Sequence, residues 1–345
     1  MNRKIFLTFL LILLLSLALY AQDEAQVFRI GMIGLDTGHA VQYTKYINDP
    51  EKNYNCKVVA GFPMGSPDIE GSIKNMGKYV KQLREEYDVE IVNSMEELCE
   101  MVDGVLVESI DGRPHLEQAR AAIVAKKPVF IDKPMAASLE DVIEIFRQAE
   151  KYGVPCWSTS PWRFSPEVYG FRNNEKIGKV VGCDGFSPCP LEEHHPDLYW
   201  YGIHGVEPLY TVMGTGCKTV QRIHTENTDF IVGVWQDGRI GTVRGTRQGR
   251  SGKGVMVYGK KGMAPPSADT FGLAHEAKSH LIDEIVNFFN TGKVPVPAEE
   301  TIEIFAFMSA ADESKKLDGK PVSVSNVIEK AKKNNKKRAQ KMGWW

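Results

Sequence analysis

The fold of this chain is decided by Val27-Phe28-Arg29-Ile30-Gly31-Met32-Ile33-Gly34-Leu35-Asp36-Thr37-Gly38-His39. An apolar run that ends in glycines and precedes a helical pattern is typical of the first strand and helix of a dinucleotide-binding βαβ unit. Counted from Gly34, the second glycine position holds Asp36 and the third holds His39. Asp36 could cap the helix or occupy the place of a phosphate oxygen, so these residues alone leave dinucleotide binding open.

Beyond this turn, short β-branched runs alternate with helical patterns as far as Ser160. This alternation predicts an α/β domain, a Rossmann-like doubly wound parallel sheet. Ligands of such sheets bind at the carboxyl ends of the strands. We predict strands at residues 27–33, 57–62, 90–92, 104–108, 128–131 and 155–158, and helices at 39–48, 71–87, 95–101, 114–126 and 138–151.

After Pro161 the pattern changes to longer strands joined by tight turns. Asp237-Gly238 separates two alternating apolar runs and predicts a hairpin. The second domain is therefore predicted to be α+β, with a large, mostly antiparallel open sheet. We expect a signal peptide at residues 1–21, the Rossmann-like domain at 22–160, the substrate and oligomerisation domain at 161–328, and a basic tail at 329–345. The tail is expected to form a frayed helix or stay solvated; docking of Trp344-Trp345 is the alternative.

The N-terminus has the pattern of a secretory signal. Arg3 and Lys4 precede a 16-residue apolar run, and Ala21 offers a small residue for cleavage. A membrane span needs about 20 apolar residues, so a retained anchor is the weaker alternative. The sequence thus predicts an exported, periplasmic protein without a stable membrane span.

Composition and charge exclude several classes of protein. The 345 residues are 43% hydrophobic and 25% charged, as in an ordinary globular protein. Residues 22–328 carry 33 basic and 43 acidic residues, and this acidic body argues against a nucleic-acid partner. We expect the six cysteines to be mostly buried thiols; one disulfide among Cys183, Cys189 and Cys217 is the alternative.

Two segments carry residues suited to chemistry. Lys133 follows the predicted fifth strand and can stabilise negative charge on a substrate oxygen. His204 follows three aromatic residues, Tyr199–Tyr201, which suits a carbohydrate because sugar C–H faces stack on rings. A surface lysine and a core histidine are the alternatives. His204 and Glu207 have a metal-like spacing but no third ligand, so we expect no metal site.

Four further pieces of sequence carry a resemblance to a known family. They are Arg29–Gly38, Pro114-His115 followed by residues 121–127, Asp132-Lys133-Pro134, and Arg163-Phe164 before Pro166. In this order they resemble the Gfo/Idh/MocA family of glucose-fructose oxidoreductase-like and inositol dehydrogenase-like proteins. The resemblance extends from about Arg29 to Val324.

The resemblance implies NAD or NADP in the first domain, a sugar or cyclitol substrate, and a homo-oligomer formed through the open sheet. It implies that Lys133 and His204 form a catalytic pair. It also implies cofactor contacts from Gly34, Asp36, Thr37, Gly38, His39, Ser66, Ser109, His115, Asp132 and Lys133, and a substrate pocket lined by Trp162, Arg163, His195, Trp200 and Tyr201.

The chain departs from its relatives at two points. Many relatives carry an aspartate four residues before the histidine, where this chain has Trp200, and the second strand ends without a ribose-binding acid, leaving Ser66 and Asp68 as substitutes. Three functions therefore stay open. They are an oxidoreductase acting on a secondary alcohol of a sugar with tightly bound NAD(P), a redox-neutral NAD-assisted glycoside-cleaving enzyme, and a cofactor-free carbohydrate-binding protein.

Overall fold

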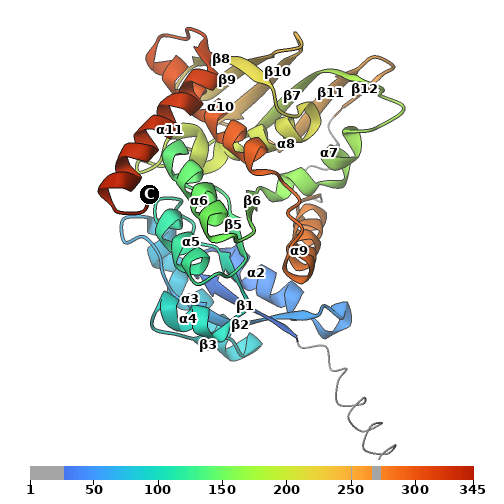
Figure 1. Cartoon of the computed structure of the whole chain (residues 1–345). Helices are drawn as coiled ribbons and strands as arrows, with labels where there is room; N and C mark the ends of the chain where they lie inside the picture. Colours follow the sequence, from blue (N-terminus) through green and yellow to red (C-terminus); the bar gives the residue numbers. More distant parts are fainter. Residues whose placement is uncertain (1–26, 250, 266–272) are drawn as a thin grey trace, which may run out of the picture.

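A six-stranded parallel sheet forms the core of the first domain, in a computed structural model that describes residues 27–249, 251–265 and 273–345 (Figure 1). The strand order is β3-β2-β1-β4-β5-β6. From β1 the chain adds β2 and β3 on one side and then β4, β5 and β6 on the other, so the strand order reverses between β1 and β4. Open parallel sheets bind their ligands at such a switch point. The strands are β1 (Phe28–Ile33), β2 (Cys56–Phe62), β3 (Glu90–Ile91), β4 (Gly104–Val107), β5 (Val129–Asp132) and β6 (Cys156–Thr159).

Helices cover both faces of this sheet, as the alternating pattern predicts. Ser94 and Ser138 cap two of them by accepting the backbone N–H of Glu97 and Asp141. The predicted Rossmann-like fold is confirmed. The helices are α2 (Gly38–Ile47), α3 (Glu70–Tyr87), α4 (Met95–Met101), α5 (His115–Val124) and α6 (Leu139–Tyr152), with a short 3₁₀ turn at η1 (Pro50–Lys52).

The second domain contains a seven-stranded sheet in the order β12-β11-β7-β10-β9-β8-β13. Its pairs are antiparallel except β10 with β7, so the mostly antiparallel sheet is confirmed. Asp237-Gly238 forms the predicted hairpin turn between β9 and β10. The strands are β7 (Val180–Pro188), β8 (Cys217–His224), β9 (Thr228–Trp235), β10 (Ile240–Thr246), β11 (Gly254–Gly259), β12 (Met263–Ala264) and β13 (Val322–Ser323).

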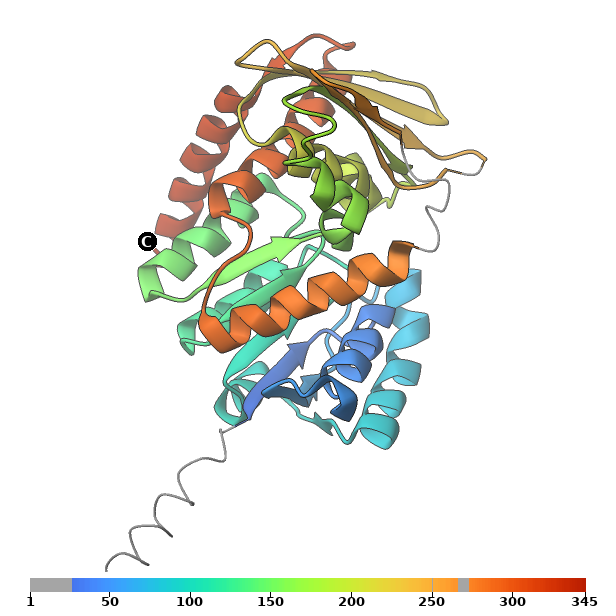
Figure 2. The same ribbon diagram turned by 90° about the vertical axis from the view of Figure 1, so that its right-hand side faces the viewer.

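Helices pack on one face of this second sheet (Figures 1 and 2). They are α8 (Ile203–Met213) and α10 (Ala298–Lys316), both rich in buried side chains. Apolar side chains remain exposed on several strands of the sheet, among them Ile223 and Ile240. The connection from the first domain runs through η2 (Pro161–Phe164), α7 (Pro166–Phe171) and the π-helical turn η3 (Leu198–Gly202).

Helix α9 (Leu273–Thr291) returns from the second sheet and lies along the first domain (Figure 2). Its residues Ile282, Ile285 and Phe288 are buried in a cluster with Trp157 of β6. This packing fixes α9 beside α2, and it brings a lysine of the second half of the chain to the edge of the first sheet.

The basic C-terminus is a regular helix, α11 (Val324–Lys341), that packs against α6. The backbone carbonyl of Trp344 accepts hydrogen bonds from Arg147 and Lys151 of α6, and Arg120 lies over its ring. The prediction of a frayed or solvated tail is therefore wrong, and the alternative, docking of the terminal tryptophans, is what the structure shows for Trp344. Buried small residues such as Ala331 and Ala339 let α11 dock, while its lysines face outward.

The six cysteines are buried free thiols, so the alternative of one disulfide among Cys183, Cys189 and Cys217 is wrong. The signal peptide, residues 1–21, lies outside the described residues. Among the helices that the structure describes, none combines the length and apolarity that crossing a membrane requires.

Candidate active site

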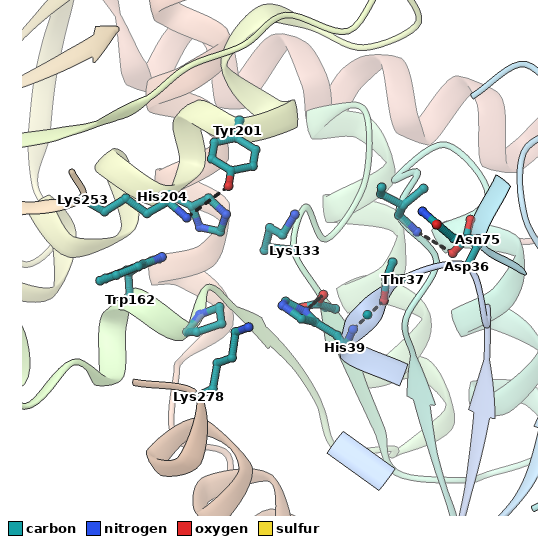
Figure 3. Close-up of a pocket in the computed structure, with 14 residues that line it drawn as sticks. Asp36, Thr37, His39, Asn75, Lys133, Trp162, Tyr201, His204, Lys253 and Lys278 are labelled. Carbon is teal, nitrogen blue, oxygen red and sulfur yellow. Dashed lines mark hydrogen bonds and ion pairs between the residues drawn. The ribbon is translucent and has the colours of Figure 1, made fainter. Parts of the chain in front are cut away.

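A cavity of about 300 Å³ lies between the carboxyl edge of the first sheet and the second domain (Figure 3). Predicted site residues supply most of its lining: Asp36, Thr37, Gly38, His39, Asp132, Lys133, Trp162, Tyr201 and His204. The sequence did not predict five further residues that line it, which are Asn75, Ile110, Pro161, Lys253 and Lys278. Residues from both halves of the chain thus meet at the switch point of the first sheet.

The turn between β1 and α2 presents the N-terminus of α2 to this cavity. Gly34 has a φ of +87°, and a side chain there would overlap the Ser109 backbone, so glycine is required. Thr37, not Asp36, caps the helix: its Oγ1 accepts the N–H of His39. The N-terminal backbone N–H groups of α2 therefore form an anion site at one end of the cavity.

Asp36 turns its carboxylate away from the helix and toward the loop after β4. Its Oδ1 accepts the backbone N–H of Ile110 at 3.0 Å, and the side chain is fully buried. Burial raises the pKa of Asp36. Asp36 therefore does not cap the helix. Its carboxylate joins the loop after β1 to the loop after β4 and does not take the place of a phosphate oxygen at the helix N-terminus.

Removing the charge of Asp36 is expected to leave dinucleotide binding intact or to strengthen it up to about fivefold, because a buried carboxylate repels the negative phosphate groups that bind beside it. Asp36→Asn removes only the charge, and Asp36→Gly removes the whole side chain. Calorimetric titration of each variant with NAD and NADP measures the effect. A loss of more than about tenfold in both variants would instead make Asp36 a direct ligand of the dinucleotide.

His39, Glu108 and Asp132 come together beside the cavity, and one side-chain nitrogen or oxygen atom of each lies within 4.8 Å of the others. His39 Nδ1 lies 2.7 Å from Asp132 Oδ2. Although burial opposes it, His39 and Lys133 keep the pKa of Asp132 below its usual range. Burial, and then the charge of Asp132, raise the pKa of Glu108 well above its usual range.

Lys133 leaves the end of β5 and extends into the middle of the cavity (Figure 3). Burial lowers its pKa, and the charges of Asp132 and Glu108 oppose that shift. Its ammonium lies 5.8 Å from the centre of the Tyr201 ring, and so it faces the second domain. This is the position that the sequence predicts for a lysine at the carboxyl edge of the sheet.

His204 lies in the first turn of α8 and faces the cavity beside Tyr201. Its Nδ1 is 2.8 Å from Ser160 Oγ, which leaves Nε2 for a ligand. Burial, followed by the charges of Lys253 and Lys133, lowers the pKa of His204 well below 6.5. The imidazole is therefore neutral at pH 7 and able to accept a proton.

Ser160 is the hydrogen-bond partner of His204 in this chain, and Trp200, four residues before the histidine, is not. The sequence did not predict Ser160, which directly follows β6 and lies two positions beyond the predicted sixth strand. When His204 Nδ1–H donates to Ser160 Oγ, Nε2 carries the lone pair that a general base needs.

Arg163 does not line the cavity, and its predicted role in the substrate pocket is wrong. The side chain is buried, with Nε 2.7 Å from Glu207 and Nη1 2.7 Å from Glu300. This buried ionic cluster joins η2, α8 and α10. The arginine at the start of the second domain thus supports the fold.

His195 and Trp200 also lie outside the cavity lining. His195 Nε2 is 2.7 Å from Asp111 Oδ1, and the ring packs against Trp200. Asp111 follows β4, so this pair ties the loop of the first domain to the second. The prediction that the two residues line the substrate pocket is corrected accordingly.

Three predicted cofactor contacts belong to the loops around the cavity. Ser66 donates to Asp111, and the substitute ribose ligand Asp68 pairs with Arg113. The two ring nitrogens of His115 face the carbonyls of Pro134 and Ser109. These side chains link the loops after β2, β4 and β5 to one another, and they hold the loops instead of facing a ligand.

The two domains, the switch-point cavity and the open helix N-terminus define the class of NAD-binding Rossmann oxidoreductases. Residues 28–160 match the Gfo/Idh/MocA model, described as an oxidoreductase family with an NAD-binding Rossmann fold. The first domain is therefore similar to the Rossmann domain of the Gfo/Idh/MocA family. The predicted nicotinamide cofactor and the assignment as an enzyme are confirmed at this level.

Solved structures resemble the chain over both domains. Scyllo-inositol dehydrogenase from Lactobacillus casei, with bound NAD(H) and scyllo-inositol, matches with a TM-score of 0.71 and 16% identity, covering 87% of this chain and 99% of that one. Myo-inositol 2-dehydrogenase from Lactobacillus plantarum gives 0.70 and 17%, covering 86% and 99%. At these identities the likeness establishes the fold. No curated protein matches the chain in sequence.

The residues that line the cavity fit a nicotinamide dinucleotide. The α2 N-terminus, with Thr37, Gly38 and His39, would hold the phosphates, because it lines the cavity and the Asp36 carboxylate is bound to the Ile110 backbone. Lys133 and His204 lie farther along the same cavity. The carboxylate that commonly binds the adenosine ribose is replaced here by loop–loop contacts.

Proposed function

We propose that this protein oxidises a secondary alcohol of a sugar or sugar derivative, with NAD or NADP as the hydride acceptor. The observation that carries the proposal is the meeting of Lys133 and His204, from different domains, in the cavity that the α2 N-terminus enters. The aromatic rings of Trp162 and Tyr201 on the facing wall suit a sugar ring. The inositol dehydrogenases among the structural neighbours support this substrate class.

Each catalytic side chain has one role in this reaction. His204 Nε2 accepts the proton of the substrate hydroxyl while its Nδ1–H donates to Ser160 Oγ. Lys133 binds the same oxygen and stabilises the negative charge that develops on it. The bound dinucleotide supplies the acceptor for the hydride. Because His204 is neutral, it is ready to take the proton at pH 7.

A panel of sugars and cyclitols tests this function. We expect net formation of reduced nicotinamide with at least one of them, together with a ketone at the oxidised carbon. Cleavage of a glycoside without net reduction would replace the proposal with the redox-neutral enzyme. Sugar binding by a protein that binds neither NAD nor NADP would replace it with the carbohydrate-binding protein.

We also propose that the protein is exported to the periplasm with a tightly held cofactor and acts as a homo-oligomer. The pattern of residues 1–21 supports export. Exposed apolar residues on the second sheet, such as Ile223 (61% exposed) and Ile240 (51%), support association through that sheet. N-terminal sequencing of exported protein and sedimentation of the purified protein test the two points; an intact Met1 or a monomer would overturn them.

A further inference from the structure

Three lysine ammonium groups face the catalytic cavity. Lys133 comes from the end of β5, Lys253 precedes β11, and Lys278 belongs to α9 (Figure 3). Within the described residues, none of the three pairs with a carboxylate; Lys253 donates to Tyr201 Oη at 3.2 Å and Lys278 to Gln42 at 2.7 Å. Clustered charges that are largely removed from water normally have a charged partner.

The acids near the cavity offset the charges of these lysines only in part. Asp132 is engaged by His39, and Asp36 is turned to the Ile110 backbone. Burial raises the pKa of Glu108, which favours the uncharged form of that carboxyl group. The cavity therefore keeps a positive field, directed at whatever binds beside Tyr201.

Lys253 is the lysine that belongs to the wall facing the first domain. Its ammonium lies 5.0 Å from the centre of the Trp162 ring and 4.7 Å from that of Tyr201. Burial, followed by the charges of Lys133 and Lys278, lowers the pKa of Lys253 to about 8. A cation held between two sugar-stacking rings, and repelled by two others, is placed to bind an anionic group of a ligand.

We infer that the substrate carries a carboxylate or phosphate group, which binds Lys253 between Trp162 and Tyr201. The inference rests on the proposed function, because it assigns the substrate class of the same site. The anion would also act on His204. Negative charge beside the imidazole offsets the repulsion from Lys253 and Lys133, so it raises the pKa of His204 and makes the histidine a stronger base in the complex.

Binding calorimetry on matched pairs of ligands tests the inference and does not require the protein to turn over a substrate. The pairs are glucose with glucuronate, galactose with galacturonate, and glucose with glucose 6-phosphate; inorganic phosphate is a further probe. We expect at least one anionic member to bind wild-type protein about tenfold more tightly than its neutral partner. The first two pairs report a carboxylate, and the third and inorganic phosphate report a phosphate.

Two lysine variants locate the binding group. Lys253→Met is expected to abolish the preference for the anion, whereas Lys260→Met, at an exposed position just beyond β11, should keep it. Affinity for the anion should fall as pH rises through about 8, since Lys253 loses its charge there. Four other titratable groups face Lys253: Lys133, Lys278, His204 and Tyr201. Any change of anion affinity with pH that remains in Lys253→Met is due to these groups.

Three outcomes would overturn the inference. They are equal affinity for every anionic and neutral pair with no binding of phosphate, equal effects of the two lysine substitutions, and a loss of NAD affinity in Lys253→Met as large as the loss for the anion. The last would assign Lys253 to the phosphates of the cofactor. Titrating the ligands with and without NAD separates this result from a failure of the proposed function, which would show as wild-type protein that binds no dinucleotide.

Discussion

Replacing either member of the catalytic pair should lower turnover by about 10²–10⁴, the usual scale for losing a positioned acid or base. Lys133→Met removes the cation that holds the reacting oxygen, and His204→Gln removes the base. Steady-state kinetics with the sugar found in the panel measure the loss as kcat. Near-normal turnover in either variant would remove that residue from the mechanism.

Ser160→Ala is the matched control for His204, because it keeps the imidazole and removes only its partner. We expect a smaller loss than in His204→Gln, together with unchanged binding of NAD. The base must be deprotonated, so activity falls as pH drops through its pKa. The acid limb of the kcat/KM profile should therefore lie below pH 6.5 in wild-type protein.

Arg163→Met is expected to reduce the free energy of unfolding by about 3–5 kcal/mol. The substitution leaves Glu207 and Glu300 as buried carboxylates without their shared cation. Urea denaturation followed by circular dichroism measures the difference. A variant as stable as wild type, but with a raised KM, would return Arg163 to the substrate pocket.

The variant that also carries Glu207→Gln and Glu300→Gln is the control for this prediction. It removes the two unpaired charges, so it should recover part of the lost stability while still lacking Arg163. If the combined variant is less stable than Arg163→Met alone, the uncompensated charge is not the cause of the loss.

The fold followed from the sequence because its signals are local. Short β-branched runs between helical patterns predicted each strand of the first sheet, and Asp237-Gly238 predicted the β9–β10 hairpin. Strands β7 and β8 were missed, since no turn motif of that kind marks them. The docking of α11 was missed for a different reason: its sequence is rich in lysine, and the contacts that hold it come from elements distant in the sequence, α6 and β8 among them.

The site was only partly predictable, because the spacing of residues along the sequence does not show which side chains are buried or which distant residues pair. Lys133 and His204 were found from their places at the ends of predicted elements. Arg163 was misassigned, since its partner Glu300 lies far along the chain. Lys253 and Lys278 carry no motif, and they reach the cavity only because β11 and α9 are placed there by tertiary packing.

The dinucleotide content of the purified wild-type protein tests the central claim most directly. Mass determination of small molecules released on denaturation is followed by titration of the emptied, refolded protein with NADH and NADPH. The structure predicts NAD or NADP in the released fraction, or saturable binding of a reduced dinucleotide by the emptied protein. A wild-type protein that releases no dinucleotide and binds neither NADH nor NADPH, while retaining its native fold, would contradict the account.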